Sequence, residues 1–313
     1  MDKKFKVLFQ MDLIEKLNLK TDTTVSLIKA ALDENLEVCI SNPEDLTFFK
    51  DSVIVKYKRV IIKKSELTFG KKIKSNINLF DYFFIRQDPP FDLNYLTNCY
   101  LLELHKRFNK KPRFINDPSG IKNFTEKLFP LYFSKLMPKT LITSEEKVFK
   151  ESLSKNSSLI IKTLYNKGGE GVTKVLKKDK NAISKFRDLK EKYKVPVVVQ
   201  SFLSKVSSGD KRVILLDGNP VGLINRVPLK GHFKANLHLG ARAEASYLTR
   251  KEMQICKEIK PHLKKNKLFF VGIDLIDEKL TEINVTSPTG IVQIEELSGV
   301  NISSMLWKKL LKN

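Results

Sequence analysis

The chain has 313 residues, of which 42% are hydrophobic, so the composition excludes wholesale disorder and allows two or three packed subdomains. Its formal net charge is +22, and only nine of its 57 basic residues are arginine. The lysines are dispersed, without long basic blocks or interleaved aromatic residues, which favours a lysine-rich surface over a nucleic-acid-binding surface. A positive field would still attract small anionic substrates.

The cysteines indicate a reducing compartment, and the histidines do not indicate a metal site. Three cysteines lie far apart, and four histidines show no spacing typical of metal ligands, so disulfides and zinc are not expected. No run of about 18 apolar residues predicts a transmembrane helix. The short apolar run near the N-terminus lacks the cleavage site of a signal peptide. The sequence therefore predicts a cytoplasmic protein without a membrane partner.

Strand and helix patterns alternate along residues 1–118, which predicts an α/β domain. Apolar spacing predicts helices over 21–36, with Thr21 or Asp22 as the N-cap, and over 93–107. Runs of β-branched and aromatic residues predict strands at 6–12, 37–41, 52–64 (with hairpin character) and 82–88.

Two further regions are expected, a smaller α/β region over 119–200 and a last region over 201–313. The junction carries a helix over 116–129 behind an Asp-Pro-Ser cap. The middle region holds predicted strands at 158–164, 172–178 and 195–203, with a glycine-rich turn and a charged helix between them. The last region holds a hairpin over 211–227 turning at Asp217-Gly218, a polar loop, a helix near 249–264, two strands and a terminal helix.

Three oxygen-bearing side chains late in the chain suggest a cation site. Glu282 and Asn284 lie two positions apart in a strand-like run, so they share one face about 7 Å apart. Asp274 stands inside the apolar run FFVGIDLI, where a carboxylate is costly unless something pairs with it. Because no histidine or cysteine is near, a hard cation such as Mg²⁺ is favoured. The alternative is a hydrogen-bonded polar patch.

A possible phosphate site lies in IIKTLYNKGGEGV. Lys162 ends an apolar strand, and Gly168, Gly169 and Gly171 follow, so the backbone N–H groups could fold around phosphate oxygens beside a lysine charge. The Walker pattern is absent, and a plain β-turn with a flexible tip is the alternative.

Two more segments have a structural and a functional interpretation. Lys127 could be a solvated lysine on an amphipathic helix or a ligand for an anion. The apolar strand that runs into Gln200 could be an ordinary buried strand or an adenine-binding hinge.

Arginine is rare in this chain, so each arginine is a candidate for bidentate binding that lysine cannot provide. Arg212, Arg226 and Arg242 fall within about thirty residues. The polar loop at 231–243 carries Lys234 and has glycines at both ends, which suits a lid over an anionic intermediate. A simple surface loop is the alternative.

Together these residues resemble the prokaryotic-type glutathione synthetases of the ATP-grasp superfamily. The resemblance covers almost the whole chain and is weakest at 50–78. The matching runs are RQDPPFDLNYLTNCYLLE, FTEKLFPLYFS, NKGGEGV, GDKRVILLDGNPV and FVGIDLIDEKLTEINVTSPTGI, in this order. The resemblance implies an α/β (α+β) ATP-grasp fold with an N-terminal parallel α/β domain, a small central lid domain and a C-terminal antiparallel-sheet domain.

The resemblance also implies a ligand set and a reaction. ATP would lie between the last two domains, and γ-glutamylcysteine and glycine would be joined to glutathione through an acyl phosphate. Another ATP-grasp carboxylate–amine ligase with a different acceptor, or a basic nucleic-acid-binding protein, are the alternatives. Family members are often homotetramers. The implied contacts are Lys127, Lys162 and the three glycines with the ATP phosphates; Gln200, Ser201, Phe202 and Leu203 with adenine; and Asp274, Glu282 and Asn284 with Mg²⁺ or Mn²⁺.

The substrate side is implied less directly. Arg212 and Arg226 would hold carboxylates or the intermediate's phosphate, and Lys234 and Arg242 belong to the mobile loop. The peptide would be seated by Ser287 beside Pro288, with Arg86 either supporting it or pairing within its own domain. The chain departs from the family at Lys234, where an arginine is usual, and at Lys167 and Glu170, where uncharged residues are usual.

Overall fold

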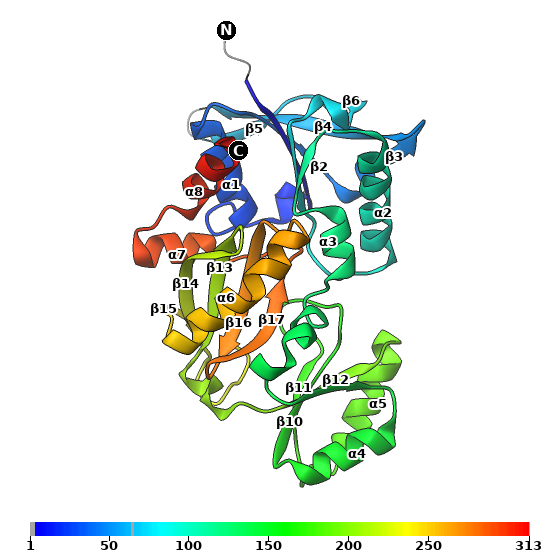
Figure 1. Cartoon of the computed structure of the whole chain (residues 1–313), viewed down its shortest axis with the longest axis vertical. Coiled ribbons are helices and arrows are strands. Elements are labelled where there is room, and N and C mark those ends of the chain that lie inside the picture. Colours follow the sequence, from blue (N-terminus) through cyan, green and yellow to red (C-terminus); the bar gives the residue numbers. More distant parts are fainter. Residues whose placement is uncertain (1–3, 64–65, 313) are drawn as a thin grey trace.

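The computed structural model describes residues 4–63 and 66–312, which form three β-sheets with helices around them (Figure 1). The predicted strand at 52–64 is confirmed up to Lys63, and its last residue lies outside the described part. Within the described ranges, no helix is both long and apolar enough to cross a membrane. The expected ATP-grasp architecture of an N-terminal α/β domain, a small lid and a C-terminal antiparallel sheet is confirmed.

The N-terminal sheet is mixed, with a parallel centre. Its strand order is β3-β4-β2-β1-β7-β8, and β5 and β6 pair with β4. The parallel strands are β1, β2, β7 and β8. The long β4 is antiparallel to β2, and it forms an antiparallel hairpin with β5, as its sequence predicts. The bounds are β1 Lys6–Met11, β2 Glu37–Ser41, β3 Leu46–Phe49, β4 Ser52–Lys63, β5 Glu66–Phe69, β6 Ile73–Asn76, β7 Tyr82–Arg86 and β8 Arg113–Ile115.

Two helices cover opposite faces of the parallel strands. Helix α1 (Thr23–Asp33) packs on the face that includes Val7 and Phe9, and α2 (Leu93–Phe108) packs on the face that includes Leu8. Asp22, one of the two predicted N-caps, caps α1 by accepting a 3.0 Å hydrogen bond from the backbone N–H of Val25.

The predicted helix over 116–129 is correct at its start and wrong at its end. Asp117 caps α3 (Pro118–Asn123), but the helix stops there and a 3-10 segment (Phe129–Leu136) follows. The reason is tertiary: the carbonyl of Glu126 accepts a hydrogen bond from Ile283 of the C-terminal domain instead of continuing a helical ladder. Lys127 is therefore buried in a turn rather than solvated on a helix.

The lid is a four-stranded antiparallel sheet in the order β11-β10-β12-β9, with two helices beside it (Figure 1). Phe149 and Phe186 stack at 4.6 Å between the helices and anchor a small core of the lid's own. The bounds are β9 Thr140–Thr143, α4 Glu146–Lys155, β10 Ser158–Lys162, β11 Val172–Leu176, α5 Ala182–Tyr193 and β12 Val197–Ser201.

The C-terminal sheet is antiparallel, in the order β15-β14-β13-β16-β17. The predicted hairpin turns at Asp217 and Gly218, whose positive φ values of 52° and 74° suit a tight turn between twisted strands. The bounds are β13 Asp210–Leu216, β14 Asn219–Val227, β15 Arg242–Ala245, α6 Arg250–Lys265, β16 Phe270–Ile276, β17 Lys279–Asn284, α7 Ile291–Ser298 and α8 Ile302–Leu311.

The last helix returns to the first domain. Trp307 of α8 is fully buried and donates a 2.9 Å hydrogen bond from Nε1 to the carbonyl of Leu27 in α1. The hydroxyl of Tyr82 in β7 donates to the carbonyl of Leu310 at 2.9 Å. Figure 1 shows α8 beside α1 at the N-terminal end of the molecule. A buried interface thus joins the N-terminal domain and the C-terminal domain.

Candidate active site

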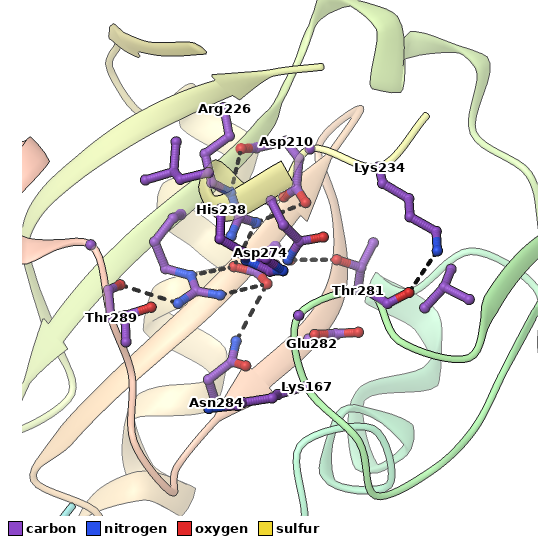
Figure 2. Close-up of a pocket in the computed structure, with 18 of the residues that line it drawn as sticks. Lys167, Asp210, Arg226, Lys234, His238, Asp274, Thr281, Glu282, Asn284 and Thr289 are labelled. Atoms are coloured by element: carbon purple, nitrogen blue, oxygen red, sulfur yellow. Dashed lines mark hydrogen bonds and ion pairs between the residues drawn. The ribbon is translucent and has the colours of Figure 1, made fainter. Parts of the chain in front are cut away.

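A cleft of about 950 Å³ lies between the lid and the C-terminal sheet (Figure 2), and N-terminal residues such as Asn18 and Asp88 line part of it. It brings together most of the residues that the sequence singles out from all three regions. Those that line it are Lys127, Lys162, Gly168, Gly169, Gln200, Ser201, Phe202, Leu203, Arg212, Arg226, Lys234, Asp274, Glu282, Asn284 and Ser287.

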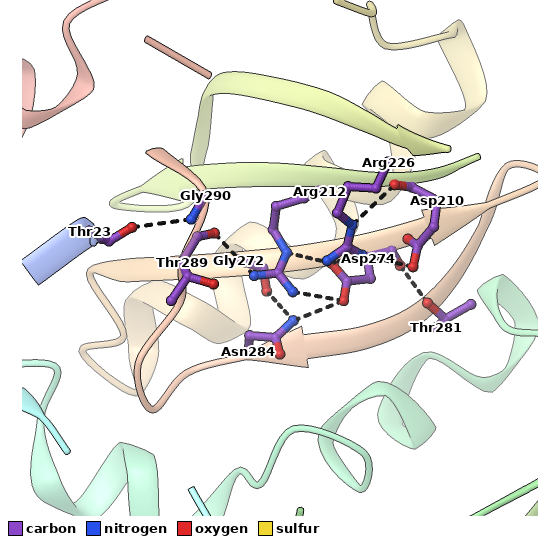
Figure 3. A network of polar contacts seen from close by, with 10 residues as sticks. All are labelled: Thr23, Asp210, Arg212, Arg226, Gly272, Asp274, Thr281, Asn284, Thr289 and Gly290. Carbon is purple, nitrogen blue, oxygen red and sulfur yellow. Dashed lines mark hydrogen bonds and ion pairs between the residues drawn. The ribbon is translucent and has the colours of Figure 1, made fainter. Parts of the chain in front are cut away.

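Strand register places Asp274 at the centre of a charged network (Figure 3). Arg212 on β13 stands opposite Asp274 on β16, and its Nε and Nη2 donate to the two carboxylate oxygens at 2.6 and 2.9 Å. Arg226 on β14 lies opposite Asp210, and its Nη2 is 2.7 Å from Asp210 Oδ2 and 3.1 Å from Asp274 Oδ1. The cost of burying Asp274 is thus offset by two guanidinium groups.

The network changes the ionisation of its members. Burial by itself would raise the pKa of Asp274, but the charges of Arg212 and Arg226 outweigh it and hold this pKa well below the ordinary value. For Asp210 the balance is reversed: burial and the neighbouring Asp274 charge raise its pKa to about 6, although Arg226 opposes the shift. Its Oδ1 is buried without a hydrogen-bond partner among the described residues.

The raised pKa of Asp210 predicts a specific pH dependence of stability. Since the folded-state pKa of about 6 lies above the ordinary value of 3.8, the ionised carboxylate destabilises the fold. The penalty is absent below about pH 4 and grows as the pH rises to about 6. We expect Asp210→Asn, which cannot ionise, to gain stability relative to wild type over this window, by on the order of 2–3 kcal/mol. Thermal melts from pH 4 to 7 measure this difference, and a constant offset across the series would contradict it.

The metal-candidate oxygens converge beside this network. Glu282 on β17 stands opposite Asp274, and its side chain is 22% exposed to the cleft. The Nδ2 of Asn284 donates to Gly272 O at 3.3 Å and to Asp274 Oδ2 at 3.4 Å, so its own oxygen keeps its acceptor capacity. Two carboxylates and one amide oxygen fit the preference of Mg²⁺ for hard oxygen ligands. Within the described ranges, no group of three or more His, Cys, Asp or Glu side chains is arranged to hold a metal ion.

Two lysines and a glycine loop form the end of the cleft nearest the lid. Lys162 ends β10, is buried, and holds its Nζ 3.7 Å from Glu282 Oε1. Lys127 is also buried and donates from Nζ to the carbonyl of Asn166 at 2.6 Å. We call residues 165–171 the glycine loop; its three glycines have φ between 64° and 77°, a region that other residues rarely adopt. This end can therefore receive phosphate oxygens on buried ammonium groups and backbone N–H groups.

The C-terminal loop at 231–243 covers the glycine loop (Figure 2). Lys234 donates from Nζ to the carbonyl of Gly169 at 2.8 Å. A Cβ atom on Gly168 would come within 2.8 Å of the ring of His238, and one on Gly169 within 2.8 Å of Asn236 Oδ1. The glycines thus permit a close approach between the 231–243 loop and the glycine loop that side chains would prevent. Such an approach is needed if the 231–243 loop is to cover an intermediate in the cleft.

The segment that connects the lid to the C-terminal sheet also lines the cleft. Gln200 at the end of β12 is buried, and its Nε2 donates to Thr140 Oγ1 at 2.8 Å. Ser201, Phe202 and Leu203 follow along the cleft wall. The ammonium of Lys174 lies 3.6 Å from the centroid of the Phe202 ring, which fixes that ring at the rim.

Four of the candidate residues lie outside the cleft lining. Arg86 is buried, donates from Nε to Thr24 Oγ1 at 3.0 Å, and lies over a phenylalanine ring. Arg242 has a side chain that is 75% exposed and bonds Glu244 at 2.9 Å. Gly171 packs on the lid, and Pro288 packs beside Gly272.

The cleft also contains residues to which sequence reasoning gave no role. Glu126, beside Lys127, lines the wall and accepts a 2.5 Å hydrogen bond from Thr286 Oγ1. Burial, and to a lesser degree the charge of Glu282, raise the pKa of Glu126. In the sequence, only its position next to Lys127 could have pointed to Glu126. Asp210 and the loop residue His238 likewise stand out only once the strands and loops are assembled.

Solved structures share this fold at low sequence identity. D-cycloserine synthetase DcsG matches with a TM-score of 0.67 at 11% identity, over 98% of this chain and 99% of that one. ATP-grasp ligase PsnB complexed with a minimal precursor matches with a TM-score of 0.64 at 15% identity, over 99% of each chain. PsnB with a phosphomimetic precursor variant, Mg and ADP matches with a TM-score of 0.61 at 15% identity, over 99% and 98%.

Sequence comparison covers both halves of the chain. The model of the prokaryotic glutathione synthetase N-terminal domain matches residues 5–122, and that of the ATP-grasp domain matches residues 126–299. The glutathione synthetase of Brucella melitensis biotype 1 is 38% identical over 96% of this chain and 97% of its own length. That of Prochlorococcus marinus subsp. pastoris is 37% identical over 98% and 99%.

The fold and the cleft between its lid and its C-terminal sheet define an ATP-grasp ligase. Family models match nearly the full length, and relatives well above 30% identity do the same. The chain belongs to the prokaryotic glutathione synthetase family, and its reaction is an ATP-dependent ligation that forms a C–N bond.

Proposed function

We propose that the protein joins γ-glutamylcysteine to glycine with ATP and Mg²⁺ or Mn²⁺, forming glutathione, ADP and phosphate. The observation that carries this proposal is the approach of Lys162 on the lid to Glu282 on the C-terminal sheet, at 3.7 Å. A phosphate-binding lysine and a metal-binding carboxylate from different domains would thus face the same nucleotide. The PsnB structure described with Mg and ADP has the same fold.

The first half-reaction would activate the peptide. The ion would be held by Glu282, Asn284 and Asp274, and when bound it would neutralise charge on the ATP phosphates. An oxygen of the peptide's C-terminal carboxylate bonds to the γ-phosphorus, and the bond from this phosphorus to the β–γ bridging oxygen breaks, so ADP leaves. Lys127 and Lys162 stabilise the transferring phosphoryl group, so that positioning and electrostatics supply most of the rate.

The second half-reaction would form the amide. The 231–243 loop covers the acyl phosphate and excludes water, which would otherwise hydrolyse it. The neutral amine of glycine bonds to the acyl carbon, the carbon–oxygen bond to phosphate breaks and phosphate leaves, while the nitrogen releases a proton to the departing phosphate or to solvent. Arg212 and Arg226 provide positive charge beside the carboxylates, and Ser287 lines the peptide side. Arg86 and Pro288 would support this side from behind, and Arg242 would act only if the loop moves.

The decisive test is ATP turnover with γ-glutamylcysteine, with and without glycine. Phosphate release that depends on both substrates supports the proposal. The alternative, a ligase with another small acceptor, predicts faster release with alanine or β-alanine than with glycine. The resemblance also favours a homotetramer in the cytoplasm, which sedimentation and cell fractionation would test.

Lys234 provides a second test of the loop. Arginine can form the same hydrogen bond to Gly169 O and adds a bidentate fork for phosphate. We expect Lys234→Arg to maintain or improve the ratio of glutathione formed to ATP consumed, and Lys234→Met to lower it several-fold as the acyl phosphate is lost to water. Parallel assays of glutathione and ADP measure this ratio. A large loss in the arginine variant would mean that the loop binds differently.

A further inference from the structure

The glycine loop is held by the N-terminal domain as well as by the C-terminal loop. The backbone N–H of Phe91 donates to the carbonyl of Tyr165 at 2.9 Å, and the two rings lie 6.4 Å apart. Two residues further along, the ammonium of Lys167 forms an ion pair with the carboxylate of Asp88. The start of the phosphate-binding loop is therefore attached to the segment that follows β7.

The Lys167–Asp88 pair lies in the cleft and is open to solvent. Both residues line the cleft, and their side chains are 49% and 31% exposed. Exposed pairs of this kind contribute little net stability and exchange partners readily. The backbone N–H of Asp88 donates to Asp12 Oδ2 at 2.9 Å, so the Asp88 backbone is held by a contact that does not depend on the ion pair.

Both members of the pair have a stronger prospective partner, if the proposed function holds. Lys167 belongs to the loop that would bind ATP phosphates, which carry more negative charge than a single carboxylate. Asp88 lies on the N-terminal wall, where the peptide would bind, and γ-glutamylcysteine carries a free α-ammonium group. Since each side chain neutralises the other, neither is available to a ligand while the pair persists.

We propose that Lys167 and Asp88 exchange partners during binding: Lys167 moves to the nucleotide phosphates, and Asp88 then receives the ammonium of the peptide. ATP binding thereby prepares the peptide site, and by linkage the peptide tightens ATP binding by the same factor. The inference rests on the proposed function. It adds a positioning residue on each side of the cleft and a direction of coupling between the two substrates.

The test measures that coupling by titration calorimetry. The non-hydrolysable ATP analogue AMPPNP with Mg²⁺ and γ-glutamylcysteine are each titrated alone and in the presence of the other. Wild type should bind γ-glutamylcysteine roughly three- to fivefold more tightly when AMPPNP is present, a factor typical of one exposed ion pair. In Lys167→Met the Asp88 carboxylate is free from the outset, so γ-glutamylcysteine alone should bind more tightly than to wild type, and the coupling factor should fall to about one.

Asp88→Asn should have the opposite signature. Without the carboxylate, γ-glutamylcysteine binds weakly with or without AMPPNP, while AMPPNP alone binds at least as tightly as to wild type because Lys167 is free. A merely structural ion pair would lower both affinities in both variants. Lys185→Met, which removes an ion pair with Asp179 in the lid outside the cleft, is the matched control and should keep wild-type coupling.

Two outcomes would overturn the exchange: wild-type coupling in Lys167→Met, or wild-type affinity for γ-glutamylcysteine in Asp88→Asn. Suppose that either result is found and that wild type makes glutathione from γ-glutamylcysteine and glycine. The partner exchange is then rejected and the proposed function is left intact. Absence of glutathione formation by wild type rejects the proposed function itself.

Discussion

Replacing Glu282 with glutamine is expected to abolish ligation while leaving the fold intact. Glutamine has nearly the same volume and keeps one oxygen, but it lacks the negative charge that would hold the divalent ion opposite Asp274. Since such an ion contributes several kcal/mol of transition-state stabilisation, kcat should fall about a thousandfold or more. The 3.7 Å contact with Lys162 lies at the cleft and contributes little to stability, so the melting temperature should change by only a few degrees.

The measurement pairs phosphate release with glutathione formation at saturating Mg²⁺. Glu278→Gln is the matched control, because Glu278 lies in the turn between the same two strands and pairs with Lys251 away from the cleft. It should retain full activity. Normal turnover by Glu282→Gln at ordinary Mg²⁺ concentrations would remove Glu282 from the metal site.

Asp274→Asn should be the most destabilising single change in the cleft. The carboxylate accepts hydrogen bonds from the buried guanidinium group of Arg212 at 2.6 and 2.9 Å, and it forms an ion pair with the buried guanidinium group of Arg226 at 3.1 Å. An amide cannot neutralise them, and its NH₂ group would face a donor. Removing one partner of a buried ionic cluster typically costs about 3–5 kcal/mol, so the melting temperature should fall by roughly 10 °C, and ligation should be lost.

Thermal melts and urea unfolding measure this effect. Because the two guanidinium charges outweigh the effect of burial and lower the pKa of Asp274, its stabilisation is present at neutral pH and is lost only as the pH falls through its low folded-state pKa. The deficit of the variant should therefore stay constant between pH 7 and 8, above the pKa of about 6 of the neighbouring Asp210. Asp277→Asn, at the partly exposed turn after β16, is the control and should melt like wild type. If Asp274→Asn left the melting temperature and the free energy of unfolding nearly unchanged, the burial of the guanidinium groups would not depend on this carboxylate.

Local sequence signals predicted the regular elements well. The parallel strands β1, β2 and β7, the caps of α1 and α3, the turn at Asp217 and the helix near 249–264 follow from side-chain periodicity and turn chemistry, whereas the short parallel strand β8 was not predicted. Weaker local patterns gave no warning of α4, α7 or the short strand β15, and the end of the helix after Asp117 was misjudged. There, a backbone hydrogen bond between Glu126 and Ile283 overrides the helical pattern.

The sequence by itself determined the kinds of groups available: hard oxygen donors two positions apart, glycines for a tight loop, and scarce arginines in the predicted hairpin. Tertiary structure alone decided which of them meet. It placed Arg212 and Asp274 opposite each other, brought Lys162 to Glu282, and left Arg86 and Arg242 outside the cleft. The physical reason is that periodicity is set by neighbours along the chain, whereas register and domain packing are set by burial and hydrogen bonding between segments far apart in it.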